Sequence, residues 1–216
     1  MIDGMFKKVA RPLVTIGFCC AAAVSLQGCV ALIVGGAVMG TFAATDRRTF
    51  GAQADDKTIV IKGETHMANA LGSAAHINVS SFNRRALLTG EVADESAKET
   101  AEREMRSIDG VQSVANELQI APISSYSVRS NDTLISAKVK ASFMDTKDLY
   151  GSAFKVVTEN GAVFLMGRVT QREGNLAGEV ARGVSGVRKV VKIFDYISEP
   201  ELKTMLATPE VQEVAK

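Results

Sequence analysis

An internal repeat is the feature of this 216-residue sequence that most constrains its fold. The segment 77–92 aligns with 154–169 at a shift of 77 residues, and Gly110-Val111 falls on Gly186-Val187 once a single residue is removed between them. A repeat of this kind indicates that the same small structural unit is built twice. The repeat defines two modules, residues 55–122 and residues 130–198.

Local signals are clearest in the second module. Asn131-Asp132 is a typical helix start, and Ile135, Val139 and Phe143 recur at the spacing of one helical face. Two apolar runs then flank Asn160-Gly161, which is a strong hairpin signal because both central residues of a type I′ turn have positive φ. These patterns predict a helix followed by two antiparallel strands.

A second helix and a third strand follow in the same module. Thr170 and Glu173 have the spacing of a capping box, and Gly186 is the expected end of the helix. The buried face of this helix is predicted to contain Leu176, Val180 and Val184. A β-rich run over 190–197 completes the order helix, strand, strand, helix, strand.

The first module repeats this order with a weaker turn signal. Asn83-Arg84 stands where the second module has Asn160-Gly161, and arginine does not favour positive φ, so we expect a looser turn. The second helix of this module is clear because four apolar residues lie on one face: Ala97, Ala101, Met105 and Ile108. Both modules are therefore predicted to be α+β.

The first 28 residues have the layout of a bacterial signal peptide. Three basic residues within 7–11 precede the uncharged run 13–25, which is shorter than the ~20 residues that a membrane-spanning helix needs. A transmembrane anchor is the alternative. The run ends at Leu26-Gln27-Gly28-Cys29, which resembles the lipobox of bacterial lipoproteins. That resemblance implies cleavage before Cys29 and attachment of diacylglycerol and an acyl chain such as palmitate to it.

The other cysteines agree with this interpretation. Cys19 and Cys20 lie inside the predicted signal peptide, and Cys29 is consumed by lipid, so the mature chain keeps no thiol for a disulfide or for catalysis. Val30 follows the lipidated cysteine, whereas aspartate there is the usual signal for retention in the inner membrane. We therefore expect sorting to the periplasmic face of the outer membrane.

The segment between the lipid and the first module is small and apolar. Residues 30–44 carry no charge, so they either lie against the bilayer or form a flexible tether. The folded region is expected to begin at Asp55-Asp56. We assign residues 29–54 to a lipidated tether and residues 199–216 to a C-terminal tail.

Two short motifs in each module resemble the BON domain of bacterial periplasmic and outer-membrane proteins. Gly-x-Val closes the hairpin, and Gly-Val-x-x-Val precedes the last strand at 110–114 and again at 186–190. Together with Ala44-Thr45-Asp46 and the run 130–133, these motifs look like the dual-BON lipoproteins associated with division and outer-membrane stress. The resemblance covers nearly the whole chain up to Ile197.

The resemblance implies an α+β fold of two tandem αββαβ modules, each with helices packed on a small mixed three-stranded sheet. It also implies that the second module binds anionic phospholipid, that the protein is enriched at the division septum, and that it supports the outer-membrane barrier.

Five glycines are expected to be structural. A side chain at Gly167 would meet the packed face or force an unfavourable backbone conformation, so Gly167→Arg is expected to unfold the second module. The alternative is an exposed strand glycine. The full set is Gly90, Gly110, Gly161, Gly167 and Gly186.

Charge separates the modules. Residues 55–120 hold seven Lys or Arg against eleven Asp or Glu, whereas residues 131–198 hold ten against seven. The second module therefore suits anionic headgroups, although a merely solvated basic face is the alternative.

Leu134 lies about 100° round the helix from the buried stripe and shares its side with Lys138. We predict that Leu134 inserts into lipid while Lys138 and Lys140 bind phosphates. Packing of Leu134 at the core edge is the alternative, and the resembled family often has a larger aromatic residue there.

An enzyme is the rival class, and the sequence does not support it. His66 and His76 fall in the acidic module without a metal-ligand pattern, and the mature chain offers no nucleophilic cysteine. We predict no catalytic residue, no metal and no cofactor beyond the covalent lipid. The balanced net charge of +1 argues against nucleic acid. The remaining alternative to lipid binding is an adaptor for envelope proteins or peptidoglycan.

Overall fold

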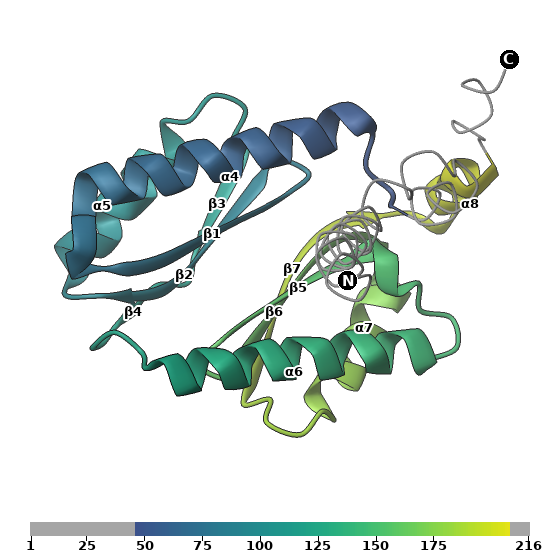
Figure 1. The fold of residues 1–216 in the computed structure, drawn as a ribbon. Helices are drawn as coiled ribbons and strands as arrows, with labels where there is room; N and C mark the ends of the chain where they lie inside the picture. Colours follow the sequence, from purple (N-terminus) through teal and green to yellow (C-terminus); the bar gives the residue numbers. More distant parts are fainter. Residues whose placement is uncertain (1–45, 208–216) are drawn as a thin grey trace, which may run out of the picture. The chain divides into compact units, whose positions relative to one another are not determined.

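The computed structural model describes residues 46–207; the predicted signal peptide, Cys29 and most of the predicted tether lie outside this range. Both modules have the predicted order of elements (Figure 1). The first module contains α4 (Phe50–Leu71), a 3₁₀ turn (Gly72–Ala74), β1 (His76–Phe82), β2 (Arg85–Val92), α5 (Glu95–Arg106), β3 (Ser113–Asn116) and β4 (Gln119–Ile120). The second contains α6 (Tyr126–Asp145), a 3₁₀ turn (Gly151–Ala153), β5 (Phe154–Glu159), β6 (Ala162–Thr170), α7 (Gln171–Arg182) and β7 (Lys189–Ile197), and α8 (Glu199–Ala207) follows it.

Each module packs two helices on one face of a small mixed sheet, which confirms the expected fold class (Figure 1). β1 pairs antiparallel with β2, which pairs parallel with β3, and β5, β6 and β7 repeat this arrangement. The helix between the second and third strands provides the crossover that a parallel pair requires. In the first module the last strand is interrupted at Glu117 and Leu118, and β4 then resumes the parallel pairing with β2.

The two hairpin turns have the same geometry, so the prediction of a looser first turn is wrong. Asn83 and Arg84 have φ values of 50° and 62°, close to the 49° and 72° of Asn160 and Gly161. Asp56, buried on α4, accepts hydrogen bonds from the backbone N–H groups of Asn83 (2.7 Å) and Arg84 (2.8 Å). These two charge-assisted bonds offset the cost of about 1–2 kcal/mol that a left-handed conformation imposes on a residue with a side chain.

The second module uses the same arrangement, which corrects the predicted start of its first helix. Asp132 accepts hydrogen bonds from the backbone N–H groups of Asn160 and Gly161, both at 2.8 Å, and therefore lies inside α6 rather than at its beginning. The helix starts earlier, where the Ser125 side chain accepts a hydrogen bond from the Val128 amide. Aspartate is a common helix cap, but this carboxylate caps a distant turn instead.

The second helix of the second module has the predicted capping box at Thr170 and Glu173. It ends at Gly183, before the predicted end, and Gly186 lies in the following turn with a φ of 97°. The predicted stripe of Leu176, Val180 and Val184 is half-buried at the edge of the core. The face of α7 that packs most tightly against the sheet consists mainly of glycine and alanine. A larger residue does not fit there, because even a Cβ on Gly174 would be 3.0 Å from the ring of Phe194. The buried residues of α7 are Glu173, Gly174, Ala177, Gly178 and Ala181.

Gly90 and Gly167 occupy equivalent positions in β2 and β6, and both are buried. A Cβ on Gly167 would lie 2.6 Å from the carbonyl oxygen of Ala153, and one on Gly90 would overlap the carbonyl oxygen of His76. The alternative of an exposed strand glycine at Gly167 is therefore wrong. Gly90 and Gly110 also have φ values of 118° and 91°, a region that favours glycine.

Three apolar clusters hold the described chain together. One lies between helices and sheet in the first module, and one lies in the same place in the second module. The third joins the modules: Phe82 and Leu87 pack in one cluster with Phe164 and Met166. Each sheet is thus covered by its own helices on one face and contacts the other module through the opposite face.

The folded region begins before the predicted Asp55-Asp56. α4 starts at Phe50, and Arg47, ahead of it, makes a buried ion pair of 2.7 Å with Glu173 of the second module. The predicted C-terminal tail also has structure, because α8 buries Leu202 and its Glu201 pairs with Arg168 at 2.7 Å. Asp55-Asp56 resembles a helix start because it is a charged pair. The residue that caps the helix is Thr49, whose side chain accepts a hydrogen bond from the Ala52 amide.

Candidate functional site

The exposed side of α6 carries two of the residues predicted to bind lipid. Ile135, Val139 and Phe143 form the predicted buried stripe. Leu134 is 60% exposed and therefore does not pack into the core edge. Lys138 follows one helical turn later on the same side and is also exposed. This side of the helix thus presents an apolar tip beside a cation.

Lys140 does not join this pair. It lies about 200° round the helix from Lys138 and lines a groove together with Lys57 of α4 and Lys155 of β5. The Lys155 ammonium donates a hydrogen bond of 3.2 Å to the Ser81 carbonyl. Burial lowers the pKa of Lys155, and the nearby positive charges add to this effect. The structure therefore divides the three predicted lipid-binding residues between two surfaces.

A second group of polar side chains lies where the modules meet, and sequence analysis missed it. His76 and Glu91 are direct partners across β1 and β2, and His76 Nδ1 lies 2.9 Å from Glu91 Oε2. Glu159, the last residue of β5, brings a second carboxylate, so that one potential ligand atom from each of the three lies within 4.8 Å of the others. The sequence shows no metal-ligand spacing because the fold assembles this group from both modules. Its sequence signal is Glu91, a charged residue near the end of the mostly apolar strand β2.

The two glutamates of this group differ in their surroundings. Burial alone would raise the pKa of Glu91, but hydrogen bonds from His76, Asn160 and the Ser124 amide outweigh it and hold the pKa below its ordinary value. Burial raises the pKa of Glu159, and a hydrogen bond from Asn78 (2.8 Å) offsets this only in part. One carboxylate is therefore well satisfied by the protein and the other is not.

The other histidine lacks such surroundings. His66 Nδ1 lies 3.2 Å from Glu104 Oε2, and both side chains are more than one-third exposed. No third potential ligand joins this pair among residues 46–207. His66 therefore provides an internal comparison for His76.

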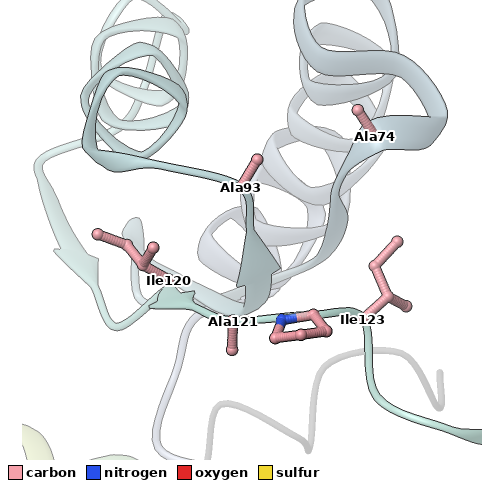
Figure 2. Close-up of a pocket in the computed structure, with 6 residues that line it drawn as sticks. Ala74, Ala93, Ile120, Ala121 and Ile123 are labelled. Carbon is pink, nitrogen blue, oxygen red and sulfur yellow. The ribbon is translucent and has the colours of Figure 1, made fainter.

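An apolar pocket of about 400 Å³ lies at the end of the first module. Figure 2 shows Ile120 and Ile123 on the segment that leaves the sheet, with Ala74 and Ala93 from neighbouring segments. The lining contains no side chain that titrates or donates a hydrogen bond. This pocket therefore supplies no groups for chemistry.

The comparisons with known proteins agree with this architecture. A model of the BON domain matches residues 55–122 and 131–197. The chain belongs to the BON-domain family. As in the two-module interpretation of the sequence, one BON domain falls on each half of the repeat.

Two curated relatives of this BON-domain protein cover most of its length. It is 37% identical over 188 residues to the outer membrane lipoprotein DolP of Haemophilus influenzae, covering 86% of this chain and 97% of that relative. It is 32% identical to the 21 kDa hemolysin of Actinobacillus pleuropneumoniae, covering 70% of this chain and 79% of that protein. Neither name denotes an enzyme, and DolP is named as an outer-membrane lipoprotein.

Similarity to solved structures is weak. The C-terminal domain of CdsD, a structural protein of the type III secretion system of Chlamydia trachomatis, matches with a TM-score of 0.28 and 9% identity, covering 62% of this chain and 96% of that one. Within residues 46–207, no helix combines the length and the apolar character needed to cross a bilayer.

Proposed function

We propose that this BON-domain protein is an outer-membrane lipoprotein, anchored by lipid on Cys29, whose second module binds anionic phospholipid. The observation that carries the proposal is the exposed Leu134 beside Lys138, on the side of α6 away from its buried stripe. A leucine suits insertion below the headgroups, while the lysine stem lets its ammonium stay at the level of the phosphates. Binding at this surface supports envelope integrity and would draw the protein to membrane rich in anionic lipid, including the division site.

The charge of the second module and the sequence similarity to a known lipoprotein support the same function. The second module carries an excess of Lys and Arg, each of which contributes about 1 kcal/mol near an anionic surface. The similarity to DolP supports the lipid anchor and the outer-membrane location. The lipobox at Cys29 supports them independently.

The test measures binding of a soluble form that begins at Asp46 to phosphatidylglycerol vesicles at low and high salt. Leu134→Glu is expected to abolish binding, because a carboxylate cannot insert and is repelled by the surface. Lys138→Glu should weaken binding and flatten its salt dependence, and Lys140→Glu should do so less, since Lys140 lies on the other flank of α6. Leu134→Trp should strengthen binding, because indole favours the headgroup boundary.

Phe50→Glu is the matched control. Phe50 is 69% exposed at the start of the first helix of the first module, and its replacement changes the net charge as Leu134→Glu does. This variant should bind nearly as the parent does. If Leu134→Glu stays folded by circular dichroism and binds as well as the parent, the lipid surface lies elsewhere. If the parent itself does not bind anionic vesicles, lipid binding is wrong and the alternative, an adaptor for envelope proteins or peptidoglycan, takes its place.

A further inference from the structure

We infer that His76, Glu91 and Glu159 form a binding site for a divalent transition-metal ion, best suited to zinc, at the junction of the two modules. Imidazole and carboxylate are donors that zinc takes in proteins, and three protein ligands leave a fourth position for water. This inference is independent of lipid binding, because the exposed side of α6 around Leu134 contributes no ligand.

The geometry is close to what zinc requires. The three ligand atoms lie within 4.8 Å of one another. Tetrahedral zinc with bonds of about 2.0–2.2 Å separates its ligand atoms by about 3.4 Å, so these atoms must approach one another by at most about 1.4 Å. Two of the three ligands are held on paired strands, since His76 and Glu91 are cross-strand partners. Glu159 engages Asn78 through Oε2, which leaves Oε1 for a metal.

The local charge favours a cation. Two carboxylates buried this close together are costly unless a positive charge balances them. Asp132 of α6 adds a third carboxylate close to Glu159, while Arg129 supplies one guanidinium, which stacks over the Tyr126 ring at 4.5 Å. The three carboxylates outnumber this one fixed cation, and a divalent ion would balance the remainder.

The site is also accessible. A pocket of about 290 Å³ is lined by His76 and Glu159 together with Asn78 and Thr158. Its lining is polar and it has room for water, so an ion can enter and keep a water ligand. Glu91, in contrast, is wholly buried and forms the fixed base of the site.

The ligands come from both modules, which gives the metal a structural consequence. His76 and Glu91 belong to the first module, and Glu159 belongs to the second. An ion bound by all three would add a link between the modules to the hydrogen bond that Asn160 donates to Glu91 (2.6 Å). Binding would also replace the direct contact between His76 Nδ1 and Glu91 Oε2 (2.9 Å).

The test uses the full chain without a polyhistidine tag, in a non-ionic detergent, after removal of metal with a chelator. Calorimetric titration with Zn²⁺ should reveal one more bound ion in the parent than in His76→Gln, and Zn²⁺ should raise the melting temperature of the parent. Glu159→Gln should weaken this binding at least tenfold, a loss that even an outer-shell substitution reaches. Glu159→Gln is isosteric, can still accept from Asn78 and removes a buried charge, so it should fold.

His66→Gln is the matched control, because it removes the other histidine–glutamate pair without touching the site. It should bind Zn²⁺ as the parent does. Equal binding by the parent and His76→Gln would refute the site. A loss in His76→Gln without a loss in Glu159→Gln would refute the link between modules, and the absence of Zn²⁺ binding by the parent would refute both.

Discussion

Two asparagines serve the hairpin turns and the contact between modules at the same time. Asn83 and Asn160 both adopt positive φ, which asparagine tolerates better than most residues. Their side chains then donate to the other module: Asn83 to Asp195 (2.9 Å) and Asn160 to Glu91 (2.6 Å). Because the two asparagines occupy equivalent turn positions, each module donates one such hydrogen bond to the other.

The two strand glycines, Gly90 and Gly167, leave no room for a side chain. Gly167→Ala should cost about 1–3 kcal/mol of stability, because its Cβ would lie 2.6 Å from the Ala153 carbonyl oxygen. Gly90→Ala should cost more, because overlap with the His76 carbonyl adds to the strain of a φ of 118°. Gly167→Arg should unfold the second module. Thermal melts followed by circular dichroism measure these losses.

Gly51→Ala is the control for these substitutions. Gly51 lies in the first turn of α4, and a Cβ there would have an ordinary contact of 3.9 Å with Thr49 Oγ1. Its stability should be unchanged or slightly higher, since alanine favours helix. Melting of Gly167→Arg at the parent's temperature would contradict the steric explanation.

At the level of elements, the ion pair between Arg47 and Glu173 ties the segment before α4 to the N-terminus of α7. Both side chains are almost completely buried, and the guanidinium donates to both carboxylate oxygens at 2.7 and 2.8 Å. Burial alone would raise the pKa of Glu173, but Arg47 and the Thr170 amide outweigh it and hold the pKa below its usual range. A lowered pKa means that this carboxylate stabilises the fold above its unfolded pKa of about 4.3, and that the contribution is lost as pH falls through the folded value.

Arg47→Ala should therefore destabilise the protein by about 3–5 kcal/mol at pH 7, because it leaves Glu173 charged, buried and unpaired. The difference from the parent should begin to shrink above the ordinary glutamate pKa of about 4.3, because burial without Arg47 favours protonation of Glu173, and should shrink further as pH falls. Denaturant titrations of both proteins at several pH values measure this. A difference that stays constant from pH 7 to pH 3 would show that the loss arises from packing and not from charge.

Elements with a local cause were predictable from the sequence. The capping box at Thr170 and the helical stripe around Val139 depend on neighbours within a few residues, and the structure has both. The predictions of a helix start at Asp132 and of a loose turn at Arg84 failed for the same physical reason. Each residue is hydrogen-bonded to a partner about 28 residues away in the sequence. Local propensity cannot anticipate a buried carboxylate that caps a distant turn.

The candidate sites show the same division. The exposure of Leu134 followed from its angle relative to the buried stripe, whereas the pairing of Glu91 with Glu159 depends on contact between modules. One sequence signal did point to that contact. The run 162–166 is apolar at every position, and such runs are typical of strands buried on both faces.

For the whole molecule, the contact between sheets decides whether the modules unfold together. Phe82 and Leu87 of the first module share an apolar cluster with Phe164 and Met166 of the second. Deleting residues 130–216 would leave the first pair uncovered. A repeated unit of this kind is expected to fold alone, though marginally, because small domains bury a low fraction of their surface. With this apolar face uncovered, we expect a fragment that self-associates or lacks a cooperative transition.

Phe164→Ala tests this coupling within the intact chain. Phe164 is 2% exposed, and replacing a buried phenylalanine by alanine costs about 3–5 kcal/mol because a cavity remains. If the modules form one cooperative unit, the loss should appear equally in hydrogen exchange of β2 in the first module and of β6 in the second, with one melting transition. Phe50→Ala is the control, since Phe50 is 69% exposed and its removal should change neither. Faster exchange in β6 with unchanged exchange in β2 would mean that the modules unfold separately, and a metal or lipid bound to one would then leave the stability of the other unaltered.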